Sequence, residues 1–285
     1  MKILFIGGKR FLGNAILNEL LLNKKIQIYL IYRGSKKPKI NDIYKKKIVF
    51  LNFDRDNFTG LKKIIYNINF DIIIDNNCYN LKSHKNLTKI LKNKNFYYIF
   101  TSSIVSYLNF KKIKNENDSI NNKNIEIHKE INKKIAINKN KIENYLINQN
   151  KFKYCILRMH NIIGKNDHSF KTKFIQNINM NIIQKFKMKM NDKIQFVFLP
   201  DIINAVKKII YKKININKIY NVANKPIYLK TIIELQKKLK FKKNNLKFKR
   251  KEIIENIIVS NQKICKELSF KFSNNDKIFK FLKKI

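Results

Sequence analysis

Six short apolar runs, separated by longer segments with helical spacing, are the feature that most restricts how this chain can fold. Each run has four to seven residues and is rich in isoleucine, phenylalanine, tyrosine or valine, as buried strands are. Between the runs, apolar residues recur every three or four positions, for example Phe58, Leu61 and Ile65. Strands that alternate with helices predict an α/β fold with a doubly wound parallel sheet of the Rossmann type. The predicted strands span 3–6, 26–32, 48–51, 71–75, 96–101 and 154–157.

Beyond Gly164 the alternation weakens, and the remaining residues to 285 are mainly helical and rich in lysine. We therefore expect a Rossmann domain over 1–164 and a smaller, mainly helical part over 165–285. Its predicted elements are a helix over 170–186, a strand over 194–198, a helix over 201–211 and a strand over 218–222. The polar segment 108–134 predicts a long loop, in which Glu116 and Asp118 stand isolated.

The chain carries 62 lysine and arginine residues against 19 acidic residues, a formal net charge of +43. Such a charge is typical of proteins that bind nucleic acid or anionic membranes. However, lysine is spread along the whole chain, and only five basic residues are arginine, which best forms bidentate contacts with phosphates and bases. Lysine, isoleucine and asparagine have codons made wholly of A and T. We therefore attribute the charge mainly to an AT-rich genome and keep RNA as the weaker alternative partner.

Residues 2–6 form an apolar strand that Gly7 and Gly8 interrupt, so the chain does not open with the h-region of a signal peptide. No stretch approaches 18 uncharged apolar residues, which argues against a membrane span. The three cysteines (Cys78, Cys155 and Cys265) lie far apart, and the four histidines lack the spacing of metal ligands. We expect a cytoplasmic protein in a reducing compartment, with no membrane partner, disulfide or bound metal.

The glycines are concentrated at one place, because four of the six fall within the first 34 residues. Directly after the first strand comes the segment Gly7-Gly8-Lys9-Arg10-Phe11-Leu12-Gly13, and a helix follows. Dinucleotide-binding folds need glycine here for a tight turn, for close approach of the backbone to the pyrophosphate and for close packing of helix on strand. Because it lies between the first strand and the first helix, this segment indicates a dinucleotide site.

Further short motifs follow the later strands. They are Tyr32-Arg33-Gly34, Asp54-Arg55-Asp56, Asn76-Asn77-Cys78-Tyr79, Thr101-Ser102-Ser103 with Tyr107, Arg158 with Asn161 and Gly164, Pro200-Asp201 and Tyr220-Asn221-Val222. Together with the glycine-rich turn they resemble the extended short-chain dehydrogenase/reductases of the NAD-dependent epimerase/dehydratase type. Arg10 stands at the middle glycine position, as in a branch that includes bacterial epimerase-like proteins and the chloroplast stem-loop-binding proteins. The resemblance covers almost the whole chain. It implies that 165–285 is a substrate-binding domain and that 196–223 returns to the Rossmann domain.

This resemblance implies a dinucleotide cofactor, NADP or NAD, and a small-molecule substrate such as a nucleotide sugar or a similar hydroxyl or keto compound. The implied reaction is epimerisation, dehydration or reduction through hydride transfer, in a protein that could form a homodimer. The implied catalytic residues are Ser103, Lys139 and Tyr107, and the implied substrate contacts are Tyr79 and Asn161. The residues implied at the cofactor are Gly7, Gly8, Arg10, Phe11, Leu12, Gly13, Arg33, Asp54, Arg55, Asn76 and Lys139.

The end of the second strand distinguishes the two cofactors. Sites specific for NAD place an acidic residue there, whereas a basic group accommodates the 2′-phosphate of NADP. This chain has Tyr32 and Arg33 at that place, with Lys36 and Lys37 close by and no carboxylate. We therefore favour NADP over NAD.

The catalytic motif of the family is incomplete. A tyrosine four residues before a lysine normally moves the proton, and here the lysine is Lys139 while the tyrosine position is Ile135. The chain has no tyrosine between Tyr107 and Tyr145, so a different register does not restore the motif. Three alternatives remain open. The protein catalyses with another group, such as Tyr107 or Tyr79; it binds a dinucleotide without turnover; or it binds RNA, as the stem-loop-binding relatives do.

Overall fold

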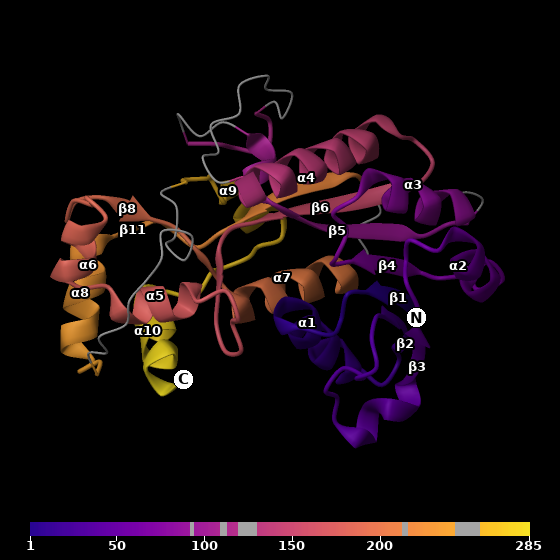
Figure 1. Cartoon of the computed structure of the whole chain (residues 1–285), viewed down its shortest axis with the longest axis horizontal. Coiled ribbons are helices and arrows are strands. Elements are labelled where there is room, and N and C mark those ends of the chain that lie inside the picture. The colour runs from indigo at the N-terminus through magenta and orange to yellow at the C-terminus, as the bar shows by residue number, and fades with distance from the viewer. Residues whose placement is uncertain (92–93, 109–112, 119–129, 213–215, 243–256) are drawn as a thin grey trace. The chain divides into compact units, whose positions relative to one another are not determined.

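The protein is described by a computed structural model that covers residues 1–91, 94–108, 113–118, 130–212, 216–242 and 257–285 (Figure 1). The chain divides into two compact units. Unit 1 comprises Met1–Asn109, Ser119–Arg158 and Val206–Tyr220, and unit 2 comprises Phe110–Asp118, Met159–Ala205 and Asn221–Ile285.

A seven-stranded parallel sheet, counted over the described residues, has the order β10-β6-β5-β4-β1-β2-β3. All six predicted strands are present, and the doubly wound fold is confirmed. The strand order reverses between β1 and β4, so ligands are expected outside the carboxyl ends of these strands. The strands span Lys2–Ile6 (β1), Gln27–Tyr32 (β2), Ile48–Asn52 (β3), Ile72–Asp75 (β4), Tyr97–Ser103 (β5), Lys153–Met159 (β6) and Lys218–Val222 (β10).

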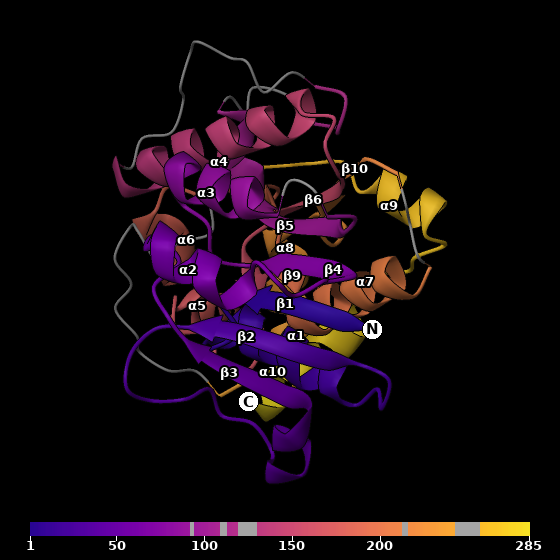
Figure 2. The same ribbon diagram turned by 90° about the vertical axis from the view of Figure 1, so that its right-hand side faces the viewer.

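Helices cover both faces of the sheet in unit 1. Figure 2 shows α2, α3 and α4 on one face and α1 on the other. The central strands are near-continuous apolar runs because both of their faces are buried, as in the stretch from Ile3 to Ile6. The side chains of Asn57 and Asn80 cap α2 and α3. The helices are α1 (Phe11–Leu21), α2 (Phe58–Ile65), α3 (Leu81–Ile90) and α4 (Glu130–Asn148), with 3-10 turns η1 (Asp42–Lys47) and η2 (Ile104–Tyr107).

Unit 2 is built from short elements around an apolar core of its own. The predicted helix over 170–186 is two helices. The first ends at Asn177, and Asn179 caps the second by accepting from the backbone N–H of Ile182 at 3.0 Å. The predicted strand over 194–198 is likewise two short strands. The strand pairs are β7 (Ile162–Ile163) with β9 (Val197–Phe198) and β8 (Lys193–Ile194) with β11 (Ile227–Tyr228). The helices are α5 (Lys171–Asn177), α6 (Met180–Lys185), α8 (Leu229–Lys238), α9 (Gln262–Glu267) and α10 (Asn275–Lys284). Helix α7 (Leu199–Tyr211) runs from unit 2 into unit 1.

The prediction that Glu116 stands isolated in a polar loop is wrong. Glu116 is buried, and its carboxylate accepts from the backbone N–H of Asn221 at 2.7 Å. Nearby, Lys114 forms a bridge with Val259, and the Lys114 carbonyl oxygen accepts from the Ser260 amide at 2.7 Å. The Asp118 carboxylate accepts from the backbone N–H of Asn115, also at 2.7 Å. Contacts between segments more than one hundred residues apart leave no signal in the local sequence. Within the predicted loop, 109–112 and 119–129 lie outside the described residues.

None of the helices in the described part of the chain is long and apolar enough to cross a membrane.

Candidate functional site at the carboxyl ends of the strands

The glycine-rich turn joins β1 to α1 and is closely packed against its neighbours. Gly7 has φ +90°, and a Cβ on it would lie 2.6 Å from the Cβ of Asn77. A Cβ on Gly13 would lie 2.0 Å from the Gly7 carbonyl oxygen. Real Cβ atoms do not approach backbone this closely, so only glycine at position 13 lets α1 begin directly against the turn. This is the close helix–strand packing that a pyrophosphate site requires.

The reversal point of the sheet brings Asn76 against the same turn. Asn76 follows β4, and its Nδ2 donates to the Gly7 carbonyl oxygen at 3.2 Å. Its Oδ1 is buried and has no hydrogen-bond partner among the described residues, so it can accept from a ligand. Of the other residues predicted in this turn, Gly8 is buried, Phe11 and Leu12 are half-buried, and Arg10 is exposed at the N-cap of α1. The structure therefore gathers these predicted cofactor residues around one helix N-terminus.

Arg33 and Asp54, which the sequence predicts at the cofactor, face each other. Arg33 Nη1 lies 3.3 Å from Asp54 Oδ2, and both side chains are exposed. Asp54 also accepts from the Asp56 amide at 3.0 Å. This backbone hydrogen bond, followed by the contact with Arg33, lowers the pKa of Asp54. The carboxylate is therefore ionised at neutral pH and already neutralised by arginine.

Arg55 turns inward, away from solvent. Its guanidinium donates to both carboxylate oxygens of Asp75, at 2.6 and 2.9 Å, and Tyr98 donates to the same carboxylate at 2.5 Å. Burial alone would raise the pKa of Asp75, but Arg55 and Tyr98 lower it to about 2. This buried pair ties the end of β3 to the end of β4, and it fixes the turn that carries Asn76 and Tyr79.

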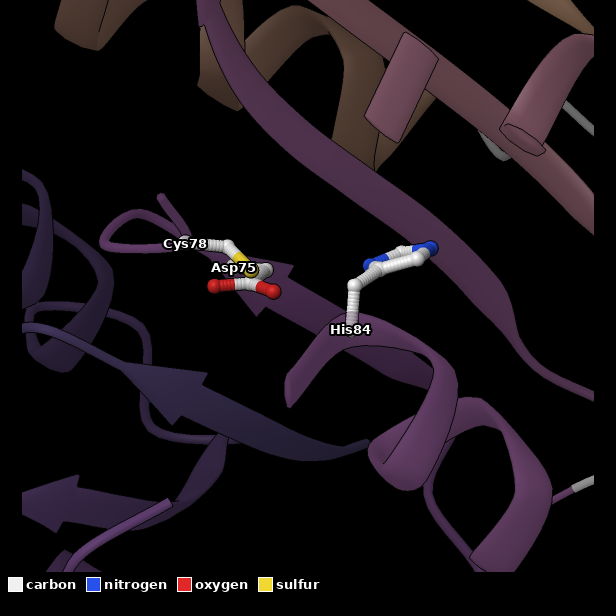
Figure 3. Close-up of side chains that lie close together, drawn as sticks. All are labelled: Asp75, Cys78 and His84. Atoms are coloured by element: carbon white, nitrogen blue, oxygen red, sulfur yellow. The ribbon is translucent and has the colours of Figure 1, made fainter. Parts of the chain in front are cut away.

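Asp75, the acidic partner in this pair, lies close to Cys78 and His84 (Figure 3). In the described part of the chain they form a cluster of three potential metal ligands whose donor atoms lie within 4.8 Å of one another. Their chemistry does not suit a cation. Both Asp75 oxygens already bind Arg55, burial raises the pKa of the Cys78 thiol to about 11, and His84 Nδ1 contacts the Tyr98 hydroxyl. We assign the cluster to the support of the turn after β4.

Lys139 lies on α4 over the end of β5. It is 4% exposed, and its Nζ donates to the Thr101 carbonyl oxygen at 2.7 Å. The rings of Tyr79 and Phe100 each lie 4.5 Å from Nζ, measured to the ring centroid. Burial lowers the pKa of Lys139 to about 8. Ile135, the position of the family tyrosine, precedes Lys139 by one turn of the same helix.

The other two predicted catalytic residues lie at the end of β5 and in η2. The Ser103 hydroxyl accepts from the Val105 amide at 3.5 Å and so caps η2. Tyr107 is fully buried, and the Arg158 guanidinium lies 4.4 Å from its ring centroid. The two tyrosines proposed as proton carriers therefore differ in their surroundings, since Tyr79 is 48% exposed and its ring lies beside the Lys139 ammonium.

A buried ion pair, which sequence analysis did not predict, holds α4 on the sheet. Arg158 Nε donates to Glu143 Oε2 at 2.8 Å, with both side chains almost fully buried. The Ser102 hydroxyl donates to the other Glu143 oxygen. Because Glu143 lies one turn after Lys139, this pair fixes the part of α4 that carries Lys139. A hint was present in the sequence, since Arg158 is one of only five arginines in a chain that otherwise uses lysine.

Asn161, the second predicted substrate residue, belongs to unit 2. Its Oδ1 accepts from Lys171 Nζ, and its backbone N–H donates to His160 Nδ1 at 2.7 Å. His160 Nε2 lies 2.8 Å from the Ile257 carbonyl oxygen. The structure therefore shows Asn161 within a hydrogen-bonded corner of unit 2 that holds residue 257.

The two buried histidines predict acid sensitivity. Burial lowers the pKa of His84 to about 4 and that of His160 to about 3, against about 6.5 in an unfolded chain. Below about pH 6.5 the unfolded chain binds protons that the folded protein does not, so stability falls as the pH falls. Between pH 7 and pH 5 we expect a loss of about 2 kcal/mol for each histidine, measured by urea unfolding.

His84→Phe should remove about half of this pH dependence, because it removes one of the two buried imidazoles. Equal stability of the unaltered protein at pH 7 and pH 5 would contradict the assignment.

Comparison with known proteins agrees with this geometry. A family model described as the NAD dependent epimerase/dehydratase family matches residues 3–223. A search of curated proteins finds no match. Similar solved structures include the UDP-N-acetylglucosamine 4-epimerase of Methanobrevibacter ruminantium M1 in complex with UDP-N-acetylmuramic acid, at 19% identity and a TM-score of 0.72 over 99% of this chain and 96% of that chain.

Two further structures have the same fold. The UDP-glucose 4-epimerase of Bifidobacterium longum, in complex with NAD+ and UDP, has 15% identity and a TM-score of 0.71 over 99% of this chain and 97% of that chain. The UDP-Glc/GlcNAc 4-epimerase of Campylobacter jejuni has 19% identity and a TM-score of 0.68 over 100% of this chain and 99% of that chain. The family match covers most of the sequence, and the fold and the glycine-rich turn agree with it. The chain belongs to the NAD-dependent epimerase/dehydratase family.

Proposed function

We propose that this protein binds NADP(H), in preference to NAD(H), and uses it to epimerise, dehydrate or reduce a nucleotide sugar or a similar hydroxyl or keto compound. The observation that carries the proposal is the close packing of the glycine-rich turn. A Cβ on residue 13 would lie only 2.0 Å from the Gly7 carbonyl oxygen, so this position admits only glycine. An ordinary strand–helix turn does not require that approach. The solved structures of similar fold are UDP-sugar epimerases, which supports a nucleotide sugar as the substrate class.

The described residues fit a dinucleotide. The amides at the start of α1 would hold the pyrophosphate, Asp54 the adenine side, and the buried, unpartnered Oδ1 of Asn76 would accept from the cofactor. Lys139 would hold the nicotinamide ribose, because its ammonium is already fixed by the Thr101 carbonyl oxygen at 2.7 Å. The bound dinucleotide supplies hydride transfer to and from the substrate carbon. Ser103 would hydrogen-bond the substrate oxygen at that carbon.

The proton on the substrate hydroxyl needs a carrier other than the residue at position 135, because isoleucine neither donates nor accepts a proton. Tyr107 is fully buried beneath Arg158, whereas Tyr79 is exposed and its ring contacts the Lys139 ammonium. We therefore place Tyr79 ahead of Tyr107 in this role. Partial burial raises the pKa of Tyr79, so a nearby positive charge is needed to stabilise its phenolate. Lys139 is in position to supply that charge.

The absence of tyrosine at position 135 also supports a second candidate, a protein that binds the dinucleotide without turnover. The two candidates make the same prediction for NADPH binding and differ in turnover. Incubation of the intact protein with NAD+ or NADP+ and UDP-glucose or UDP-N-acetylglucosamine tests this directly, with product epimers and reduced nicotinamide as readouts. Product formation supports the enzyme, and saturable binding without any product supports the non-catalytic candidate.

Ile135→Tyr is expected to increase turnover about a hundredfold, because it restores a proton carrier one turn before Lys139. Ile135→Phe is the matched control, since it adds a similar ring without the hydroxyl and should leave turnover at the level of the unaltered protein. The rates are compared in the assay above. Turnover in the unaltered protein that already equals that of Ile135→Tyr would show that the missing tyrosine does not limit the reaction.

A further inference from the structure

We propose that a pocket in unit 2 binds a nucleoside phosphate, either a free nucleotide or one nucleotide of a single-stranded nucleic acid, with its base stacked on Tyr228. The pocket has a volume of about 670 Å³, within the range of ligand-binding pockets. None of its lining residues is among those predicted at the cofactor or the substrate, so the inference does not rest on the proposed function. All of them belong to unit 2; they are Asn191, Asp192, Lys193, Tyr228, Lys230 and Ile258.

Tyr228 presents an aromatic ring to solvent between two positive charges. It is 39% exposed, and the Nζ atoms of Lys193 and Lys230 lie 4.8 and 5.5 Å from its ring centroid. Lys193 faces Tyr228 across the antiparallel pair of β8 and β11, and Lys230 follows in the first turn of α8 (Figure 1). The two ammonium groups are therefore held around one ring, within reach of the same ligand.

Backbone hydrogen bonds fix the wall of the pocket beside this ring. The backbone N–H of Leu229 donates to the Asp192 carbonyl oxygen, and that of Lys230 donates to the Met190 carbonyl oxygen, both at 3.0 Å. These bonds tie the start of α8 to the turn that precedes β8. The relative positions of the ring and the two lysine backbones are therefore set before any ligand binds.

The segment that carries Ile258 is held as firmly. The buried side chain of Gln195 accepts from the backbone N–H of Val259 at 2.8 Å and donates to the Val259 carbonyl oxygen at 3.0 Å. The Ile258 carbonyl oxygen accepts from the backbone N–H of Lys114 at 3.2 Å. A ligand in this pocket therefore meets walls that are already ordered, which lowers the entropic cost of binding.

The lining groups match the parts of a nucleotide. The two ammonium groups supply point charges for a phosphate, and an exposed tyrosine ring is a stacking surface for any base. The one carboxylate, that of Asp192, is directed to its own turn, since its Oδ2 accepts from the backbone N–H of Lys189 at 2.8 Å. The positive end of the α8 dipole lies at the same place, because the helix begins at Leu229. Asn191 adds a side-chain amide that can hydrogen-bond a base or a ribose.

A tyrosine beside two lysines carries little information in a chain this rich in lysine, and the chain offers a control for it. Tyr66, at the end of α2 in unit 1, is 51% exposed. The Nζ atoms of Lys62 and Lys94 lie 5.4 and 5.8 Å from its ring centroid. Tyr66 therefore reproduces the ring and the two charges outside this pocket.

Calorimetric titration of the full-length protein with 5′-UMP tests the proposal. Tyr228→Ser is expected to weaken UMP about tenfold, because the stacking surface is lost while serine remains a good N-cap for α8. The double variant Lys193→Gln with Lys230→Gln should weaken UMP by about tenfold as well. Tyr66→Ser should bind UMP as the unaltered protein does, and so should Gly13→Asp, in which the glycine-rich turn is blocked. Thermal melting of each variant confirms that it is folded.

Smaller and larger probes identify the ligand. Uridine lacks the phosphate and ribose 5-phosphate lacks the base, so each should bind about tenfold more weakly than UMP. Single-stranded octauridylate distinguishes the two sources of the nucleotide. If it binds more tightly than UMP, the ligand is a nucleic acid, and loss of both lysines should then reduce the slope of log Kd against log salt by about 1.4, or about 0.7 for each phosphate contact. Equal affinities assign the pocket to a free nucleotide.

Four results would overturn the proposal. They are unchanged affinity in Tyr228→Ser, equal weakening in Tyr228→Ser and Tyr66→Ser, loss of UMP binding in Gly13→Asp, and absence of binding of both UMP and octauridylate up to about 10 mM. Ribose 5-phosphate that binds as tightly as UMP would show that the base does not stack, and it would equally contradict the assignment. None of these assays requires a dinucleotide, so a failure to bind NADPH is a separate result.

Discussion

Gly13→Asp is expected to abolish saturable NADPH binding. A Cβ at this position would lie 2.0 Å from the Gly7 carbonyl oxygen and 2.7 Å from Asn76 Nδ2, so the start of α1 must move away from the turn. That movement displaces the amides that would hold the pyrophosphate, and the new carboxylate adds a negative charge where the ligand is negative. Fluorescence titration with NADPH measures the loss, which should exceed about a hundredfold in Kd.

Two alanine variants serve as controls. Gly13→Ala adds the Cβ without the charge, and Gly60→Ala changes a glycine outside the glycine-rich turn. Gly13→Ala should also lose most of its affinity, because its Cβ collides with backbone. Gly60→Ala places its Cβ 2.2 Å from the far end of the Phe53 ring, a side chain that can move aside, so NADPH binding should be nearly unchanged. If folded Gly13→Asp bound NADPH as the unaltered protein does, the glycine-rich turn would not be the cofactor site.

Arg158→Met is expected to lower the free energy of unfolding by about 3–5 kcal/mol, since it leaves the buried Glu143 carboxylate without its cationic partner. Glu143 is fully buried, and its two oxygens are held by Arg158 and Ser102. Urea unfolding measures the loss. Because Glu143 fixes the turn of α4 that carries Lys139, the variant should also weaken NADPH binding.

The double variant Glu143→Leu with Arg158→Met tests the cause. It removes both charges, so it should be more stable than Arg158→Met alone, as expected when the single variant strands a buried charge. A smaller change, Ser102→Ala, should cost about 1 kcal/mol, because it removes one hydrogen bond to the carboxylate. A loss below about 1 kcal/mol in Arg158→Met would contradict the account of this ion pair.

The strands of unit 1 were predictable because each is an apolar run that both faces of the sheet bury, and the doubly wound parallel sheet was predictable from their alternation with helices. The glycine-rich turn was predictable because its function needs glycine in a chain that has only six. Contacts between distant segments were not predictable. Arg55 forms an ion pair with Asp75 and Arg158 with Glu143, and neither spacing nor local composition specifies such partners.

The arginines give the clearest lesson about composition. Of the five in the sequence, Arg55 and Arg158 lie in buried ion pairs and Arg33 faces Asp54. The planar guanidinium can bind a carboxylate through two N–H groups and is less strongly hydrated than an ammonium, so lysine does not replace it well in buried pairs. In a chain otherwise dominated by lysine, an arginine therefore marks a place where geometry matters. The sequence singled out Arg158 on these grounds but did not identify Glu143 as its partner.

Calorimetric titration of the intact, unaltered protein with NADPH and with NADH tests the central claim most directly. The account predicts saturable binding of both, at one dinucleotide per chain, with the lower Kd for NADPH. Absence of any heat of binding for either dinucleotide up to about 1 mM would contradict it.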